Sequence, residues 1–380
     1  FNKGKVRASY AKVGNDTSPY RTQSSYSIDQ ARTLDYTVAS IPGSLPNPNL
    51  KPEVSHSWEV GTELGFFNNR IHLDFTYYET LTEDQIMAVP ISGSSGFSSY
   101  TTNAGSIKNK GFETQLNLVP IQNDKFTWDM GLSITKSKST VESIDESLES
   151  ITLNSLMGVS IEARPGEEFG TIYGLDYLRD NFGTKLITDE GLAQPGERIK
   201  LGSINPDFYG GISNNFSFKN FSVRTLISYQ SGGEFFSWGR GYRQMFGTDA
   251  TSLEGRETGI IEEGINENTG FENTVPISPL LKNYTNNFVS NIRKDLIFDA
   301  SNVKFKELVI SYDIPKKALN SVGIQGATVS AVGRDLFFIY NPNGDLDPDA
   351  SNGSSPTATA LEHASLPSTR TYGINLRLNF

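Results

Sequence analysis

The chain has 380 residues, with 33 basic side chains against 43 acidic ones and a formal net charge of −10. This acidic balance argues against nucleic-acid binding, which requires a basic footprint. There is no cysteine, and the three histidines (His56, His72 and His363) lie far apart, which excludes disulfide frameworks and thiolate metal sites and argues against a histidine-rich one.

Two long alternating runs are the first clear elements. From 53 to 65, apolar residues such as Trp58 and Val60 occupy even positions, and acidic or small residues such as Glu59 occupy odd ones. After a turn at 66–69 the alternation resumes. Because successive side chains point to opposite faces of a strand, each run predicts a two-faced strand. The first run, at about 13 residues, exceeds the roughly five or six usual for a strand in a soluble sheet.

The same alternation recurs to the end of the chain, with a phase slip near Lys306 and Glu307 that indicates a bulge. We count ten main strands and allow for an extra hairpin inside a long loop. The expected strands cover residues 5–13, 53–65, 70–78, 112–118, 126–135, 207–219, 221–230, 302–314, 325–337 and 371–380.

The connections between these strands alternate strictly in length. Short turns at one end and long loops at the other are typical of an outer-membrane β-barrel. The expected fold is therefore an all-β, antiparallel transmembrane barrel with long extracellular loops. The short connections are 66–69, 120–125, 219–220 and 315–324, and the long ones are 14–52, 81–105, 140–206, 234–301 and 339–367.

In such a barrel the apolar face of each strand meets lipid and the polar face lines the lumen. The parity of each run then assigns individual side chains. We expect Trp58, Leu73, Phe75, Trp128, Leu132 and Leu376 to face lipid, and Glu59, Glu63, Asp74, Glu113, Asp129 and Arg377 to face the lumen.

Ordered blocks along nearly the whole chain resemble one family, the SusC/RagA-type TonB-dependent outer-membrane transporters of Bacteroidetes. The resemblance implies a large barrel in the bacterial outer membrane with an N-terminal plug, driven by the TonB complex and covered by a SusD-like lipoprotein lid. It further implies import of an oligosaccharide or a peptide. The blocks are NPNLKPEVSHSWEVGTELGFFNNRIHLDFTYYET (47–80), SGFSSYTTNAGSIKNKGFETQLNL (95–118), GSINPDFYGGISNNFSFKNFSVRTLISYQSGG (202–233), NVKFKELVISYDIP (302–315), GRDLFFIYN (333–341) and STRTYGINLRLNF (368–380).

The chain departs from that family pattern in one respect. It contains no TonB box, no plug and none of the early strands, whereas transporters of this type have about 22 strands around a plugged lumen. We therefore expect residues 1–380 to be the C-terminal part of the barrel domain, with edges at 3–13 and 368–380 that do not pair with each other. Two alternatives remain open: a self-contained structural or adhesive barrel, and a secreted β-rich carbohydrate-binding protein.

The best candidates for substrate or partner contact lie at the start of the long loop 234–301. Aromatic faces and arginine forks suit sugar rings and peptides. The alternative is that these aromatics pack the loop or belong to an aromatic girdle. The candidates are Phe235, Trp238, Arg240, Tyr242 and Arg243, with Tyr173, Tyr177 and Arg179 from the loop 140–206.

A weaker candidate is a calcium site at Asp345, Asp347 and Asp349. Their alternate spacing resembles the start of a calcium loop, but the closing glutamate at the twelfth position is missing. A solvated turn explains the same residues. No other cofactor is expected.

No motif predicts catalysis. Ser133 and Lys136 match the S-x-x-K pattern, which requires a helix, but parity places them on opposite faces of a strand. The Gly- and Ser-rich stretch 96–111 lacks the Gly-Lys-Ser/Thr of a phosphate loop and is expected to be a rim loop leading into a strand. Acidic pairs such as Glu262 and Glu263 are ordinary in external loops. We therefore expect no catalytic residue and no enzyme.

Overall fold

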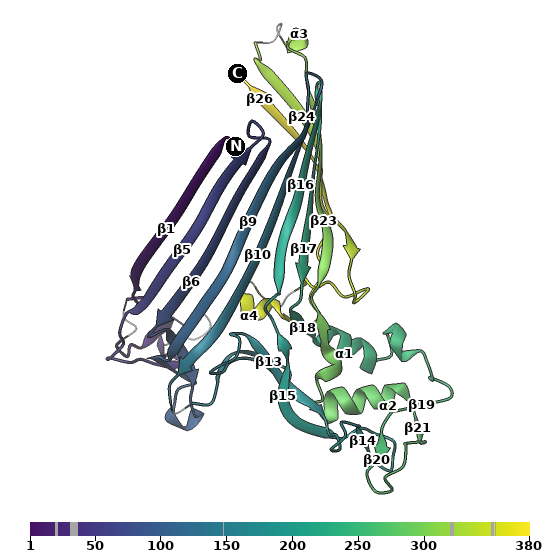
Figure 1. Ribbon diagram of the computed structural model, residues 1–380. Helices are drawn as coiled ribbons and strands as arrows, with labels where there is room; N and C mark the ends of the chain where they lie inside the picture. The colour runs from purple at the N-terminus through teal and green to yellow at the C-terminus, as the bar shows by residue number, and fades with distance from the viewer. Residues whose placement is uncertain (20–21, 31–36, 147, 320–322, 351–352, 354) are drawn as a thin grey trace.

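Ten long antiparallel strands form a single curved wall in the computed structural model, which describes residues 1–19, 22–30, 37–146, 148–319, 323–350, 353 and 355–380 (Figure 1). The strands lie side by side in chain order, as the sequence predicted. They are β1 (Lys3–Asn15), β5 (Glu53–Phe66), β6 (Ile71–Glu83), β9 (Gly105–Gln122), β10 (Phe126–Ile144), β16 (Phe208–Phe218), β17 (Phe221–Ser231), β23 (Asn302–Asp313), β24 (Gly326–Tyr340) and β26 (Thr371–Asn379).

The short turns lie at the upper end of the wall in Figure 1 and the long loops at the lower end, which confirms the predicted asymmetry. Two of the turns depend on left-handed backbone. Phe67, Asn68 and Asn69 have φ values of 54°, 55° and 62°, and Lys219 of the two-residue turn has 53°. Asparagine tolerates this conformation well, and tight hairpin turns require it.

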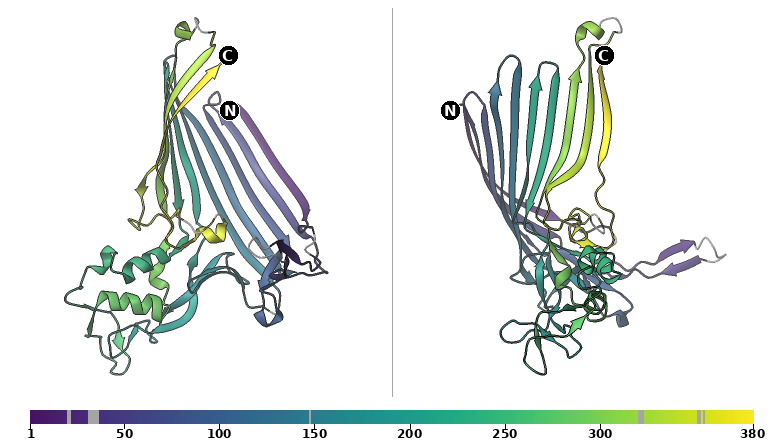
Figure 2. Two further views of the ribbon diagram at one scale, coloured as in Figure 1. Left: turned by 180° about the vertical axis from the view of Figure 1, so that it is seen from behind. Right: turned by 90° about the vertical axis from the view of Figure 1, so that its right-hand side faces the viewer.

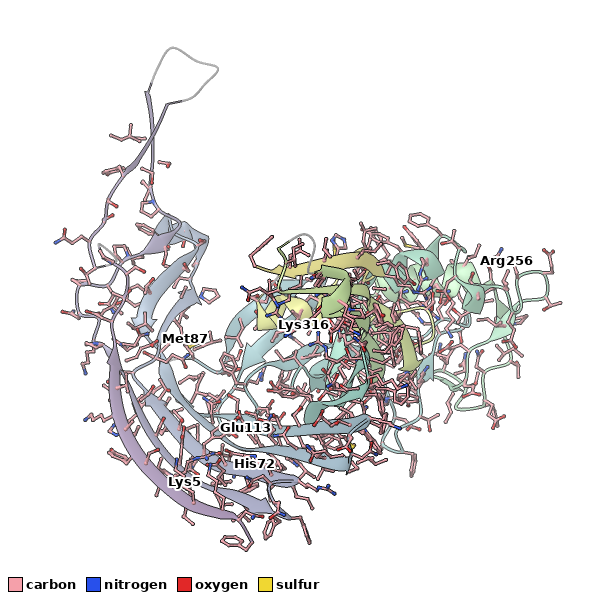
Figure 3. All side chains as sticks on the ribbon, turned by 90° about the horizontal axis from the view of Figure 1, so that it is seen from above. Lys5, His72, Met87, Glu113, Arg256 and Lys316 are labelled. Atoms are coloured by element: carbon pink, nitrogen blue, oxygen red, sulfur yellow. The ribbon has the colours of Figure 1, made fainter. Side chains whose placement is uncertain are left out.

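The register confirms the predicted division into two faces. On the apolar face Leu73 lies opposite Leu64 and Leu116, and Leu116 lies opposite Leu132. The opposite face carries charge: the Arg7 guanidinium donates to the Asp74 carboxylate at 2.5 Å and 3.1 Å. Figure 3 looks down the curved wall, with Lys5, His72 and Glu113 of this polar face labelled. The register places the six residues expected to face lipid on the apolar face of the sheet, and the six expected to face the lumen on its polar face.

A bulge lies where the phase slip predicted it. The pairing of β17 with β23 passes from Glu307 directly to Phe305, and the pairing of β23 with β24 makes the same jump, so Lys306 has no opposite residue. The extra residue returns the apolar side chains before and after it to the same face.

The two edge strands of the wall, β1 and β26, do not pair with each other. The two ends of the sheet are separated in the right-hand view of Figure 2. The expected open sheet is therefore confirmed, and a closed ring of these ten strands is not formed. Within the described ranges, no helix is long and apolar enough to cross a membrane.

The long connections contain much more structure than the one extra hairpin that the sequence analysis allowed for. Residues 148–207 and 232–301 fold into a compact unit, the loop domain, around a four-stranded sheet. Its sheet consists of β11 (Ile151–Leu156), β12 (Val159–Ala163), β13 (Thr171–Tyr177) and β15 (Pro195–Ser203). Beside the sheet lie α1 (Trp238–Met245), α2 (Pro279–Tyr284), the π-helix η3 (Thr285–Val289) and the 3-10 helices η2 (Ala250–Ser252) and η4 (Lys294–Leu296).

Short strands complete this end of the molecule. The loop domain also contains β14 (Leu186–Ile187), β18 (Glu234–Ser237), β19 (Ile260–Ile261), β20 (Ile265–Asn266), β21 (Pro276–Ile277) and β22 (Ile297–Asp299). Elsewhere lie β2 (Ser27–Gln30), β3 (Thr37–Ser40), β4 (Ser44–Leu45), β7 (Ile86–Pro90), β8 (Ser99–Asn103) and β25 (Leu361–Glu362), with η1 (Gly93–Ser95), α3 (Lys316–Leu319) and α4 (Pro356–Thr359). The stretch 96–111 was expected to be a rim loop, but most of it is strand: it contains β8 and the first residues of β9.

The main hydrophobic core lies in the loop domain and not in the wall. The side chains of the wall strands are mostly half-buried or exposed, whereas the loop domain buries its apolar side chains against one another. The buried cluster includes Val159, Ile161, Ile172, Phe235, Phe236, Trp238, Leu296 and Leu361. The last of these belongs to β25, which pairs with β18 and so ties the 341–370 connection to the loop domain.

Candidate functional site

Two of the candidate aromatics, Phe235 and Trp238, are almost fully buried, although Phe235 contributes to the lining of a cavity described below. Each side chain is 2% exposed. Helix α1 begins here because the Ser237 hydroxyl caps it by accepting a hydrogen bond from the Arg240 backbone N–H at 3.1 Å. The first helical residue, Trp238, then packs inward against Phe236, with ring centroids 6.2 Å apart. Trp238 therefore belongs to the hydrophobic core of the loop domain.

The candidates from the other loop are also mostly interior. Tyr173 donates to the Glu167 carboxylate at 2.6 Å, and burial together with that carboxylate raises the pKa of Tyr173 to about 12. The ring of Tyr177 lies 3.9 Å from the Lys185 ammonium, and the Tyr177 hydroxyl donates to Asp295. Arg179 is 37% exposed but donates to the Gly183 carbonyl in its own hairpin. These three do not join the remaining candidates.

The structure brings Arg240, Tyr242 and Arg243 together at one cavity of about 350 Å³. The two arginines lie three residues apart on α1 and therefore share a face of the helix. The opposite walls come from the connection between β24 and β26. Its lining residues there are Asp345, Leu346, Asp347, Ala350, Glu362, Ala364, Ser365 and Pro367.

One carboxylate connects the two arginines across this cavity. Asp345 Oδ1 accepts from Arg240 Nη1 at 2.6 Å, and Asp345 Oδ2 accepts from Arg243 Nη1. Burial alone would raise the pKa of Asp345, but the guanidinium groups outweigh it and hold that pKa below its usual value. Behind them, Asp249 is almost fully buried, and its Oδ2 lies 2.9 Å from Arg240 Nε.

Aromatic rings extend this site toward solvent. The Tyr242 ring stacks on His363 with centroids 5.9 Å apart, and on Phe246 at 6.2 Å. Phe246 is mostly exposed. An open aromatic stack beside a polar cavity can contact the face of a sugar ring or the side chains of a peptide.

The three aspartates of the weak calcium candidate bind different partners. Asp347 accepts from the Ser368 backbone N–H at 2.8 Å, and Asp349 accepts from Lys304 Nζ at 2.9 Å. Asp345 is held by the arginines. Across the described part of the chain, no group of three potential ligands is arranged to hold a metal ion. The proposed calcium set is therefore not assembled, because lysines, arginines and a serine already bind its oxygens.

Sequence reasoning missed three contributors to this site: Asp249, Glu362 and His363. Glu362 accepts from the Ser237 hydroxyl at 2.5 Å and from the Gly239 N–H at 3.0 Å, which fixes the start of α1. These contacts join residues more than 120 positions apart. No local sequence pattern could have revealed the role of Glu362.

The chain matches one family model and several curated proteins. Residues 2–192 match the family described as TonB dependent receptor-like, beta-barrel. TonB-dependent receptor P3 of Formosa agariphila is 28% identical over 408 residues, which cover 99% of this chain and 39% of that protein. TonB-dependent receptor SusC of Bacteroides thetaiotaomicron is 38% identical over 90 residues, which cover 23% of this chain and 9% of that protein.

Solved structures share the fold. The structure of the RagAB peptide importer in the 'closed-closed' state superposes with a TM-score of 0.71 at 20% identity, covering all of this chain and 41% of that one. The structure of the RagAB peptide transporter has a TM-score of 0.69 at the same identity, covering 99% of this chain and 41% of that one. The chain thus spans about two fifths of the length of TonB-dependent receptor P3 and of these structures.

Proposed function

The chain belongs to the TonB-dependent receptor-like β-barrel family, within its SusC/RagA type, and on that premise we propose that it forms wall and outer loops of a nutrient importer. Proteins of this family lie in the bacterial outer membrane. The observation that carries the proposal is the ten-stranded wall, apolar on one face and charged on the other, with every long loop at the same end. That arrangement suits a lipid boundary on one side and an aqueous path on the other.

The importer is completed by further strands and a plug. Both edge strands, β1 and β26, carry rows of backbone groups without a strand partner in this sheet. In lipid, each unsatisfied backbone group costs several kcal/mol. Additional strands at both edges remove this cost and enlarge the lumen. Energy coupling to the TonB complex then occurs through the N-terminal part and not through any residue of this wall.

The loop end is where solute and lid protein meet the chain. The loop domain projects beyond the strands there (Figure 1). A SusD-like surface lipoprotein is the proposed lid. The solute is an oligosaccharide or a peptide: the stacked rings of Tyr242, His363 and Phe246 suit a sugar face, and the polar cavity at Arg240 suits either class.

Uptake by the source bacterium tests the proposal. A deletion strain and its complemented parent would be given labelled oligosaccharide and peptide mixtures separately. We expect the deletion to abolish uptake of one mixture, and an ionophore that collapses the proton gradient to abolish the same uptake in the parent. Unchanged uptake of both mixtures in the deletion strain would reject the proposed transport.

The two alternatives have less support. A self-contained ten-strand barrel requires β1 to pair with β26, and these strands do not pair. A secreted carbohydrate-binding protein would not need a wall with rows of exposed apolar side chains such as Ile374 and Leu376. Detergent-dependent extraction from the membrane fraction would distinguish the importer from a secreted protein.

A further inference from the structure

We propose that Arg240 and Arg243 form a carboxylate-binding site of the import path, which Asp345 occupies here and vacates when the carboxylate of a solute binds. The inference rests on the proposed import function and deepens it by naming the chemical group that the site recognises.

The site's present occupant defines its chemistry. Each oxygen of the Asp345 carboxylate accepts a hydrogen bond from one arginine, and Nη1 is the donor in both. Arginine presents planar, fixed donors that match a carboxylate, so this arrangement is a receptor for that group. Asp345 belongs to a different connection, more than 100 residues away in sequence. The arginines are therefore fixed on α1, and their ligand is supplied from outside the helix.

The local charge balance favours exchange of one anion for another. The carboxylate of Asp249 stays in place because Thr251 donates to its Oδ1 from the backbone at 3.0 Å and from the hydroxyl at 2.7 Å. If Asp345 withdraws, two arginines face one buried aspartate and a net positive charge remains. Another anion must then take its position, since a partly buried guanidinium without a counter-charge is unfavourable.

Asp345 is the replaceable member of this cluster. Its side chain is 55% exposed, whereas that of Arg240 is 14% exposed. Ion pairs to half-exposed groups contribute little to stability because water and salt screen them. Gly344, directly before it, has φ = 66° and open space around its Cβ position. The segment keeps its other attachments through Asp347 and Asp349, so Asp345 can leave without unfolding it.

The surrounding cavity restricts what the carboxylate can be attached to. Besides the arginines it is lined by Asp347 and Glu362, which repel a second negative group, and by Tyr242 and Leu346. The site therefore favours a single carboxylate on a neutral or cationic body. A peptide C-terminus and a single uronic acid residue in an oligosaccharide both carry this chemistry.

Binding to the purified, detergent-solubilised full transporter tests the site. Calorimetry would compare N-acetyl-dialanine with its C-terminal amide, and methyl glucuronide with methyl glucoside. We expect a carboxylate form to bind and its neutral analogue not to bind. The peptide pair and the sugar pair distinguish the two sources of the carboxylate.

Variants separate the proposed exchange from nonspecific attraction. Asp345→Asn removes an internal competitor whose effective concentration is in the millimolar range, so binding should tighten about tenfold. Arg243→Gln should abolish it. The matched controls are Asp189→Asn, whose carboxylate accepts from the side-chain amides of Asn266 and Asn268, and Arg179→Gln, which is 37% exposed like Arg243 but does not line the cavity. Both controls should bind like wild type.

Two results would overturn the inference: equal binding of acid and neutral forms, or unchanged binding of both acids by Asp345→Asn. The latter remains informative even if Arg243→Gln fails to fold, because Asp345→Asn changes a half-exposed side chain and keeps its shape. Failure here is distinguishable from failure of the import proposal. If the deletion strain loses uptake but the purified transporter binds no carboxylate, only this site is rejected. If the transporter binds carboxylates but the deletion strain shows no uptake defect, only the import function is rejected.

Discussion

At the scale of single residues, burial decides which candidates can act on a solute. Trp238 has the ideal chemistry for stacking on a sugar, yet it packs under Arg293, whose guanidinium carbon lies 4.7 Å from the ring centroid. Arg293 is itself buried and donates to the Met157 and Asn287 carbonyls, and burial lowers its pKa to about 10. Trp238 and Arg293 therefore stabilise the loop domain, whereas Arg243 is partly exposed at the cavity.

We expect Trp238→Ala to destabilise the loop domain by about 3–5 kcal/mol, since it leaves a large cavity in a packed core. Limited proteolysis should show faster cleavage within 148–207 and 232–301 while the strands stay protected. Arg243→Ala should leave the proteolysis pattern unchanged. A Trp238→Ala protein that resists proteolysis as wild type does, but has lost uptake, would restore Trp238 as a contact residue.

Glu262 gives the loop domain a pH-dependent stability. Its buried carboxylate accepts from Lys185 Nζ at 2.8 Å and also pairs with Lys282. Burial raises the pKa of Glu262, but the two lysines outweigh burial and hold it below the usual 4.5. A lowered pKa in the folded state stabilises the fold above the unfolded value, and this contribution is lost as the pH falls through the folded pKa.

Glu262→Gln should therefore cost about 2–3 kcal/mol at pH 7, less than the roughly 3–5 for breaking a fully buried pair because both lysines are partly exposed. Its unfolding midpoint should also vary less between pH 7 and pH 4 than that of wild type. Denaturation followed at several pH values measures both. Parallel pH dependence of the two proteins would show that Glu262 is not the responsible group.

At the scale of elements, each wall strand is defined by its two faces and by close backbone contacts. On β16, Gly210 is required because a Cβ there would lie 2.0 Å from the Ser133 carbonyl oxygen and 2.7 Å from the Tyr229 hydroxyl. Tyr229 crosses over this glycine and donates to that same carbonyl at 2.9 Å. The aromatic ring covers the gap that the glycine leaves between strands.

Gly210→Ala should destabilise the folded wall by about 1–3 kcal/mol, the usual cost of overpacking. The control is Gly373→Ala on the edge strand β26, where nothing lies within 4 Å of the added Cβ. Heat-modified mobility on gels, which separates folded from unfolded barrels, would give both midpoints. Equal midpoints would contradict the close contact at Gly210.

The two faces of β10 and its neighbours should respond oppositely to charge. Leu132 lies on the apolar face opposite Leu116 and Ile212, and Leu132→Arg should cost about 2–4 kcal/mol if the residue sits at mid-membrane. The control is Gln115→Arg on the adjacent strand, because Gln115 is an exposed residue of the polar face. Refolding into lipid vesicles measures both. A greater loss for Gln115→Arg would reverse the assignment of faces.

At the scale of the whole molecule, the wall and the loop domain are joined by the short acidic segment 345–349. Asp345 binds α1, while Asp349 binds Lys304 and Lys306 on β23. Lys304 is almost completely buried at this junction. The segment 345–349 therefore links the cavity at Arg240 to β23, the strand that carries the bulge.

The separation of the two edge strands is testable with introduced cysteines, since the chain has none of its own. In the full transporter, cysteines at Ala8 of β1 and Asn375 of β26 should not form a disulfide, because these strands are not neighbours. Cysteines at Ala8 and Val60, which are directly opposite in the register, should cross-link on oxidation. Efficient joining of positions 8 and 375 would indicate a closed ring.

The sequence by itself determined the wall. Alternation has a strict period of two, so it located the ten strands, assigned Leu132 and Asp129 to opposite faces, and placed the bulge at Lys306. The alternation of short and long connections determined which end carries the loops. All of these depend on residues close together in the chain.

Only the tertiary structure decided the interior of the long loops. Within the long loop 234–301, a short aromatic run such as 234–246 fits a surface strand, a helix or a core segment equally well, because it is too short for its periodicity to distinguish them. Trp238 became a core residue by packing under Arg293, and Asp345 became a ligand of Arg240, more than 100 positions away. Glu362 holds the start of the helix that carries Trp238 and Arg240. The free energy of burying apolar side chains selects those partners, and it depends on the whole packed unit rather than on any local pattern.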